Sequence, residues 1–306
     1  MKNNILVYGA GGIAIRHVQS ILDENNVGKI YIYDKKKSAL GKMSKFFDDN
    51  KNNHKLILCS QQKEIKKKKF FLAFLCTYAF NRVPLIKKIK KLCNIKYFIV
   101  EKILESNIVN FKKTKFDTKN IFVNMPLRNI SPFKIIKSNI KKKKVYARLH
   151  ATNWNMICNS LHYINYISYI IKSPVEKISI KKLSKSYKLR RKNFIDFYGE
   201  IMTYYKDGSQ LQIVSKKNTK KHYFYLEQEK KKFIYNFSDN HLKTENKSLS
   251  CKMEYVSQLS NKFYKSLSKY KKVQLPSFND ALNENFLFIQ ELLKKLKKKS
   301  DILKIT

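Results

Sequence analysis

Cysteine is scarce in this sequence and follows no recognisable spacing. The five cysteines lie at positions 59, 76, 93, 158 and 251 of the 306 residues, an odd number without a Cys-x-x-Cys pair. Disulfide frameworks and zinc clusters need paired, regularly spaced cysteines, so the sequence favours neither. We therefore expect a protein of the reducing cytoplasm that holds no metal.

Long apolar runs are also missing. The longest, Phe70 to Phe80, is about half of the roughly 20 residues that a membrane-spanning helix needs. The N-terminus combines Lys2 with an apolar run, as a signal peptide does, but Arg16 follows at once and no small-residue cleavage site occurs. We expect neither a membrane span nor a signal peptide. The 43% of hydrophobic residues instead support a globular chain with one large or two modest domains.

Acidic residues are few compared with basic ones. The 22 aspartates and glutamates stand against 65 lysines and arginines, a formal charge of +43 that invites a nucleic-acid-binding function. Arginine, glycine, proline, alanine and tryptophan are scarce, however, a composition typical of an AT-rich genome. The lysine runs at 66–69, 141–144 and 297–299 lie between apolar segments, as solvated turns do. Nucleic-acid binding stays the less favoured alternative, although the positive field would attract anionic cofactors and substrates.

Only seven glycines occur, and three of them form one motif. Residues 5–8 predict a strand, residues 9–14 (Gly-Ala-Gly-Gly-Ile-Ala) a tight turn into a helix, and residues 30–33 a second strand. In dinucleotide sites the first glycine permits the turn, the second lets the backbone approach a pyrophosphate, and the helix N-terminus supplies free amides. Asp34 ends the second strand, near the spacing expected for an acid that binds a ribose 2′-hydroxyl. An ordinary strand-to-helix turn would not need this acid, so we favour a cofactor site at Gly9, Gly11, Gly12, Ile13 and Asp34.

Apolar runs and helical stretches continue to alternate after Asp34. This alternation predicts a parallel sheet covered by helices on both faces, the doubly wound Rossmann fold. The sequence thus predicts an α/β protein with an NAD(P)-binding Rossmann domain over residues 1–123. We expect helices near 38–48 and 82–92 and strands at 55–58, 70–76, 97–100 and 121–123.

A different pattern begins near Pro126. Residues 124–306 predict a C-terminal α+β domain whose sheet is mainly antiparallel, with helices on one face. Apolar residues spaced by three and four predict a last helix, 277–299, that packs back toward the first domain. We also expect a helix at 160–171, a hairpin on the Asp207-Gly208 turn, and strands at 223–226 and 233–235.

Two stretches carry side chains suited to catalysis. Glu101 and Lys102 follow the strand 97–100, at the sheet edge where open α/β folds bind ligands. A lysine there can stabilise an alkoxide during hydride departure; a salt bridge at the strand end is the equally weighted alternative. His162 lies on a predicted helix and could act as a general base, although a helical histidine is more often structural.

These motifs, taken in order along the chain, resemble the Gfo/Idh/MocA family, the glucose-fructose oxidoreductase and inositol dehydrogenase-like enzymes. The resemblance covers nearly the whole chain, and it extends in particular to members linked to bacterial surface-sugar biosynthesis. The general family motif is carried by Gly9 to Ala14 with Arg16-His17, Cys76-Thr77, Glu101-Lys102, His162 and Leu275-Pro276-Ser277. The subgroup features are Glu-Lys-Ile-Leu from Glu101, Val123-Asn124-Met125-Pro126 with Arg128, and the segment from Asn153-Trp154 to His162.

The resemblance implies an NAD(P)-dependent oxidoreductase that acts on a sugar hydroxyl or carbonyl, in surface polysaccharide or glycan biosynthesis for the subgroup. It implies that Lys102 orients the reacting oxygen, that His162 carries its proton, and that the second sheet mediates homo-oligomerisation. Thr77 and Glu101 would join the glycine motif and Asp34 in binding the cofactor. The implied substrate residues are Lys102, Trp154, Asn155, Cys158, Asn159 and His162.

The sequence departs from the family pattern around both motifs. Ile103 and Tyr78 replace prolines, while Cys158 and Asn165 replace acids that flank the histidine. The missing carboxylate at Asn165 motivates one alternative, a catalytically impaired scaffold protein that keeps the dinucleotide fold. Asp34 would repel a 2′-phosphate, which favours NAD. The lysines at 35–37 would offset this repulsion, so NADP stays open.

Overall fold

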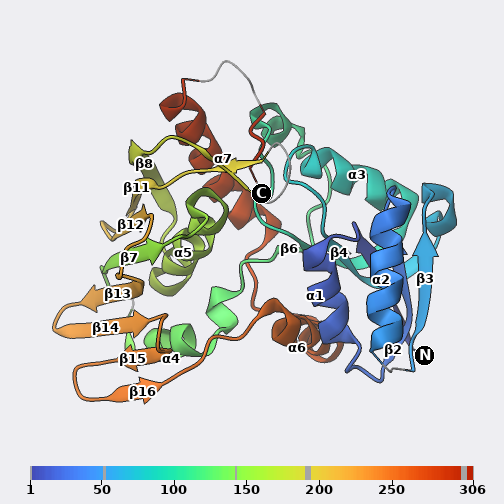
Figure 1. Ribbon diagram of the computed structural model, residues 1–306, viewed down its shortest axis with the longest axis horizontal. Helices are drawn as coiled ribbons and strands as arrows, with labels where there is room; N and C mark the ends of the chain where they lie inside the picture. Colours follow the sequence, from blue (N-terminus) through green and yellow to red (C-terminus); the bar gives the residue numbers. More distant parts are fainter. Residues whose placement is uncertain (1, 51–52, 142, 190–193, 298–301, 306) are drawn as a thin grey trace.

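The computed structural model describes residues 2–50, 53–141, 143–189, 194–297 and 302–305. Two large sheets lie side by side, with helices packed around and between them (Figure 1). The elements of the first part are β1 (Asn3–Tyr8), α1 (Gly12–Ile21), β2 (Val27–Tyr33), α2 (Lys37–Asp49), β3 (Lys55–Cys59), η1 (Gln62–Ile65), β4 (Lys69–Leu75), α3 (Arg82–Leu92), β5 (Asn94–Val100), η2 (Ile108–Lys113) and β6 (Ile121–Val123).

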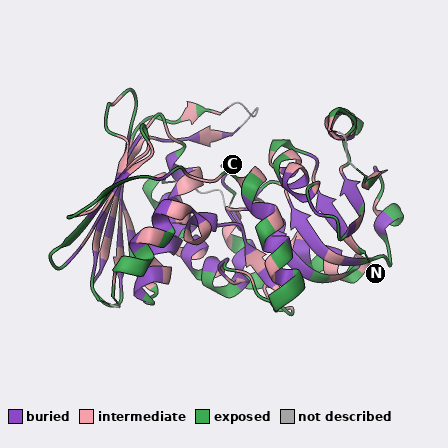
Figure 2. Ribbon diagram, turned by 90° about the horizontal axis from the view of Figure 1, so that it is seen from below, coloured by how far each residue is buried: buried purple, intermediate pink, exposed green. Residues whose placement is uncertain are grey.

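The first sheet is the expected Rossmann sheet. Its six strands are parallel and follow the order β3-β2-β1-β4-β5-β6. The strand order reverses between β1 and β4, and open sheets bind ligands at the carboxyl ends of the strands at such a point. Most strand residues are buried, as Figure 2 shows, because helices cover both faces; the strands are therefore continuous apolar runs in the sequence. The helix expected at 82–92 and the strand at 121–123 are confirmed residue for residue.

The second sheet is mainly antiparallel, as expected, and has eight strands in the order β16-β15-β14-β13-β7-β12-β11-β8. Inward residues alternate with half-exposed ones along β7, so one face packs on helices and the other stays open. The elements are η3 (Pro126–Asn129), α4 (Ser131–Asn139), β7 (Tyr146–Thr152), α5 (Met156–Ile171), β8 (Val175–Leu183), β9 (Tyr187–Lys188), β10 (Ile195–Asp196), β11 (Gly199–Tyr205), β12 (Gln210–Lys216), β13 (Tyr223–Gln228), β14 (Lys231–Asn236), β15 (His241–Lys243), β16 (Ser248–Ser250), α6 (Val256–Tyr270) and α7 (Phe278–Lys295).

Several elements of this half were not expected from the sequence, among them α4, β7, β8 and α6. Strand β7 pairs in parallel with β12, which the hairpin-based interpretation did not anticipate. Helix α6 packs against α1 of the Rossmann sheet, and the backbone N–H of Asn261 donates to Ser20 Oγ at 2.9 Å. The segment that follows the antiparallel sheet thus returns to the first half of the molecule.

The last helix begins where expected and ends earlier. Ser277 caps α7, its hydroxyl accepting the Asp280 amide, and the helix ends at Lys295; residues 298–299 of the predicted range lie outside the described residues. Helix α7 contacts β8 and α5 on one side and β6 and η2 on the other. The division into domains 1–123 and 124–306 stays a proposal. None of the described helices is long and apolar enough to cross a membrane.

Candidate active site

The glycine turn, the start of α1 and Asp34 come together at the carboxyl end of the Rossmann sheet. Gly9 has a φ of +99°, and a Cβ there would lie 2.9 Å from the carbonyl oxygen of Cys76, so only glycine fits. Gly11 and Gly12 face open space instead, and no side chain caps α1. The Asp34 carboxylate accepts the Ala10 amide at 2.8 Å, which ties the end of β2 to the turn.

A cleft of about 670 Å³ opens beside this turn, between the ends of β4 and β5 and the start of α5. It unites three predicted cofactor residues, Ile13, Thr77 and Glu101, with three predicted substrate residues, Lys102, Asn155 and Cys158. Lining residues that the sequence interpretation missed are Cys76, Arg82, Asn153, Tyr187, Lys188 and Leu189.

The cleft has the features that a dinucleotide needs. The Thr77 hydroxyl oxygen is buried and has no hydrogen-bond partner among the described residues. The space next to Gly11 and the uncapped N-terminus of α1 suit a pyrophosphate group. Asp34, tied to the glycine turn through the Ala10 amide, is the acid at the end of β2 that such sites use to bind a ribose hydroxyl. The residues present therefore fit the cofactor that the motif predicts.

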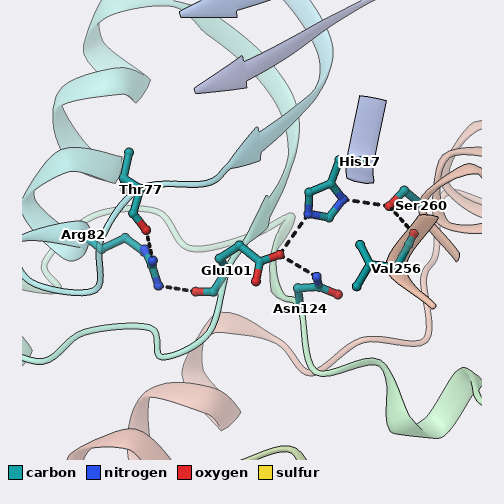
Figure 3. Close-up of polar contacts among 7 residues, drawn as sticks. All are labelled: His17, Thr77, Arg82, Glu101, Asn124, Val256 and Ser260. Atoms are coloured by element: carbon teal, nitrogen blue, oxygen red, sulfur yellow. Dashed lines mark hydrogen bonds and ion pairs between the residues drawn. The ribbon is translucent and has the colours of Figure 1, made fainter. Parts of the chain in front are cut away.

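Glu101 lies at the centre of a buried network (Figure 3). Its Oε1 accepts from His17 Nε2 at 2.9 Å and from Asn124 Nδ2 at 2.6 Å, and His17 Nδ1 lies 2.7 Å from Ser260 Oγ on α6. Burial alone would raise the pKa of Glu101, but the hydrogen bonds and charge of His17, together with Asn124, hold it below its usual value. The alternative of a Glu101–Lys102 salt bridge is wrong for the described residues, since the two side chains turn to different partners.

Arg82 is the buried cation beneath this network, with 1% of its surface exposed. Its guanidinium donates to the backbone carbonyls of Thr77 and Glu101, as Figure 3 shows, and also to that of Ile103. Burial lowers the pKa of Arg82 to about 10, which leaves the group charged at neutral pH. Arg82 thus ties the end of β4 to the loop that carries Lys102. The only feature of the sequence that could have drawn attention to Arg82 is that arginine is rare, with six in the chain.

Lys102 reaches across the cleft to the start of α5. Its Nζ donates to the Cys158 carbonyl at 2.8 Å, to Cys158 Sγ at 2.9 Å and to Asn159 Oδ1 at 2.8 Å. None of the three acceptors is a carboxylate, so the ammonium is oriented without a direct ion pair among the described residues. An oriented cation in a cleft can stabilise a negative charge that develops on a substrate oxygen.

Asp196 was not predicted, although it holds the first turn of α5. This fully buried carboxylate accepts the amides of Ile157 at 2.9 Å, Phe197 at 2.7 Å and Cys158 at 3.3 Å. Burial raises the pKa of Asp196 to about 6, and these hydrogen bonds oppose the rise. The cap also explains why α5 begins at Met156, four residues before the predicted start. Asp196 follows Cys158 by 38 residues, a pairing that local sequence does not reveal.

His162 and Trp154 lie near the cleft without lining it. His162 Nδ1 is buried and has no partner among the described residues. Burial, and secondly the charge of Lys102, lower the pKa of His162 well below its usual value, so the imidazole is neutral. Trp154 presents its carbonyl to the Tyr187 hydroxyl at 3.2 Å, while its ring meets the edge of Tyr163.

Asn165 lies outside the cleft altogether. Its Oδ1 accepts from Arg128 at 2.7 Å, and its Nδ2 donates to Glu284 on α7 at 2.9 Å. An acid is thus present next to Asn165, supplied by another helix. The expectation that Asn165 removes a carboxylate from the site does not follow from this arrangement. No group of metal-ligating side chains large enough to hold an ion occurs in the described part of the chain.

The fold is shared with solved oxidoreductases, although the sequence is not. No protein-family model matches the chain, and no curated protein is similar to it in sequence. Myo-inositol dehydrogenase from Lactobacillus casei, in complex with NAD(H) and myo-inositol, has a TM-score of 0.73 at 13% identity, over 98% of this chain and 96% of that one. UDP-N-acetylglucosamine 3-dehydrogenase from Acidithiobacillus ferrooxidans has a TM-score of 0.67 at 7% identity, over 97% of each chain.

A third structure broadens the range of substrates. Biliverdin reductase from Synechocystis, in complex with biliverdin and NADP+, has a TM-score of 0.67 at 11% identity, over 95% of this chain and 98% of that one. The fold expected from the resemblance to the Gfo/Idh/MocA family is confirmed. Because the neighbours bind a polyol or a bilin, or are named for action on a sugar nucleotide, the fold itself does not select a substrate.

Proposed function

We propose that the protein is an NAD(P)-dependent oxidoreductase that transfers a hydride between the cofactor and a sugar or sugar derivative. The observation that carries this proposal is the cleft that Thr77 and Ile13, next to the glycine turn, line together with Lys102 and Cys158. The bound dinucleotide would supply the hydride chemistry. The neighbours of the same fold, including an inositol dehydrogenase with NAD(H), support this assignment.

The described side chains support a division of roles. Gly9, Gly11, Gly12 and Asp34 would hold the pyrophosphate and ribose. Lys102, which follows β5 and reaches across the cleft, would donate to the reacting oxygen and stabilise its alkoxide. His162 is the candidate proton acceptor that the family resemblance implies. Its imidazole is neutral and can accept a proton, although burial and the charge of Lys102 lower its pKa and weaken it as a base. Asn155, Cys158 and Asn159 would orient the substrate, with Trp154 behind them.

Asp34 favours NAD over NADP, for the reason that its carboxylate would repel a 2′-phosphate. We further propose a homo-oligomer formed through the open face of the second sheet, and a substrate from surface-sugar biosynthesis; both rest on the family resemblance. The scattered cysteines remain the reason to expect a cytoplasmic protein.

A fluorescence titration with NADH and NADPH at physiological salt tests the cofactor assignment. We expect saturable binding, tighter for NADH, and its loss in Gly11→Asp, whose carboxylate would occupy the pyrophosphate position. Absence of binding to the wild-type protein would remove the basis for the enzyme assignment. If NADH binds, a panel of sugars and sugar acids assayed with NAD would identify the substrate.

Two other functions make different predictions in the same assays. The impaired scaffold protein would bind NADH and oxidise no member of the panel. The nucleic-acid-binding alternative requires DNA or RNA affinity that persists at ordinary ionic strength, with a steep dependence on salt.

A further inference from the structure

A second cavity, of about 460 Å³, is lined by residues of η3, α4, α5 and α6. Four cationic side chains line it, those of Arg128, Lys134, Lys137 and Lys262, and none of the described residues that line it is a carboxylate. The cavity shares no lining residue with the cleft. Tyr169 of α5 lines this cavity, and Cys158 of the same helix lines the cleft. The two residues are 11 positions apart, which corresponds to roughly 16 Å along an α-helix.

Arg128 is the most informative of these cations. Lysine is so abundant here that a group of lysines alone means little, but arginine occurs six times among 65 basic residues. The Arg128 guanidinium stacks on the ring of Tyr169, 4.1 Å from its centroid, and Nη2 donates to Asn165. Two contacts therefore fix the plane of the guanidinium, as recognition of a planar or tetrahedral anion requires.

The charge of Arg128 has no direct counterion. Its Nε is buried and has no partner among the described residues, and no carboxylate of the described chain lies within ion-pair distance. Glu284 is separated from it by the amide of Asn165, which binds both. Burial lowers the pKa of Arg128, and the more distant charges of Glu284 and Asp280 only partly oppose this effect. An anion from solution would compensate this charge.

The three lysines surround the same space from two helices. Lys134 and Lys137 are one turn apart on α4, so they share a face, and Lys137 Nζ lies 5.4 Å from the centroid of the Tyr169 ring. Lys262 faces them from α6 and has one acidic neighbour, Glu254, at 3.7 Å. The positive charge is therefore concentrated toward Arg128 and α4.

We propose that this cavity binds a compact phosphate group, either free phosphate or the phosphate of a small metabolite, with Arg128 as its principal ligand. A guanidinium of fixed orientation with ammonium groups around it matches the charge and geometry of phosphate. The proposal goes beyond the oxidoreductase function, since the cavity is separate from the cleft and needs no dinucleotide.

Calorimetric titration with inorganic phosphate tests the site. The titration uses the Gly11→Asp protein at physiological ionic strength, because this change removes the other phosphate-binding feature, the glycine turn. We expect one saturable site, weakened about tenfold or more by Arg128→Gln. Lys247→Gln, which removes one exposed charge beside β16, should leave the affinity unchanged.

A parallel titration with glucose 6-phosphate identifies the source of the phosphate. Tighter binding than that of inorganic phosphate would indicate a phosphorylated metabolite, and equal or weaker binding would indicate the free ion. Because NADH binding is measured separately on the wild-type protein, failure of the oxidoreductase assignment does not affect this result.

Two results would overturn the proposal: no saturable phosphate binding, or the same loss of affinity in Arg128→Gln and Lys247→Gln, which would indicate only the diffuse positive field. Arg128→Gln also removes contacts to Tyr169 and Asn165, so the variant could fail to fold. In that case Lys134→Gln combined with Lys137→Gln, both on the exposed face of α4, should weaken phosphate severalfold. Unchanged affinity in this double variant would equally contradict the site.

Discussion

The carboxylate of Asp196 accepts the backbone N–H of Ile157 at 2.9 Å, and this one hydrogen bond joins a short strand to the helix that faces the cleft. The next two residues on that helix, Cys158 and Asn159, hold the Lys102 ammonium. Asp196 therefore acts on the cleft indirectly, through α5. It positions the acceptors that in turn position Lys102.

Substitution Asp196→Asn should uncouple this arrangement. An amide would set its NH2 group against a backbone N–H donor, so one hydrogen bond would be replaced by repulsion. We expect turnover to fall by about ten- to a hundredfold, which corresponds to a loss of transition-state stabilisation of roughly 1.4–2.8 kcal/mol. The dissociation constant for NADH should stay unchanged. Steady-state kinetics and cofactor titration measure the two effects. Asp239→Asn, on an exposed turn, is the matched control and should change neither; equal loss of cofactor binding in Asp196→Asn would indicate general unfolding instead.

Two glycines in the same turn should respond differently to the same change. Gly9→Ala would force a side chain into a positive-φ conformation and against the Cys76 carbonyl, which should cost about 1–3 kcal/mol or more of unfolding free energy. Gly11→Ala meets no atom within 4 Å, so the protein should keep its stability. Its methyl group would instead occupy the space where a pyrophosphate approaches, and NADH affinity should fall. Urea unfolding and NADH titration of both variants make the comparison; normal NADH binding by Gly11→Ala would show that the cofactor lies elsewhere.

Lys102→Ala should separate catalysis from cofactor binding. Loss of a positioned donor to a developing oxyanion typically lowers turnover by about two to four powers of ten. The glycine turn and Asp34 do not depend on Lys102, so the dissociation constant for NADH should stay nearly the same. The exposed Lys185→Ala serves as control for the loss of one positive charge. A parallel fall in NADH affinity would assign Lys102 a structural role.

The Rossmann half could be predicted from the sequence because its information is local. Continuous apolar strands, a glycine turn and an acid at a fixed distance each reflect one structural requirement, and α3 and β6 were predicted to the residue. The same holds for Glu101 and Lys102, which lie at the carboxyl end of a strand whose position is set by its apolar run. Residues of this kind can be placed before any long-range contact is known.

The remainder of the site depends on contacts between distant segments. Arg82 appears in the sequence as the first residue of a helix, and only the fold shows that it binds three carbonyls from two loops. Asp196 meets α5 across 38 residues, and His17 meets Ser260 across 243. Asn165 was interpreted as the loss of a carboxylate that flanks His162 in the family pattern. The helix turns it toward α7 instead, where Glu284 supplies the acid.

Glu284 should make the stability of the protein depend on pH. Burial raises the pKa of Glu284 to about 7, from an ordinary value of 4.5 that the unfolded chain would retain. Between these values the folded protein binds a proton that the unfolded chain has released, so stability falls as the pH rises through this range and levels off above it. From pH 5.5 to pH 8, Glu284 should lower the unfolding free energy by about 2 kcal/mol, which is roughly 1.5 pH units at 1.36 kcal/mol each.

The variant Glu284→Gln isolates this contribution, because glutamine cannot ionise and still accepts a hydrogen bond from Asn165. The difference in unfolding free energy between variant and wild type should shift in favour of the variant by about 2 kcal/mol on going from pH 5.5 to pH 8. Urea denaturation at the two pH values measures it. Asp196, with its pKa of about 6, also titrates near this range, but it is present in both proteins and cancels in the difference. A difference that does not change with pH would mean that Glu284 is already ionised at pH 5.5. In that case the charge of Arg128 would lower the pKa of Glu284 more than burial raises it.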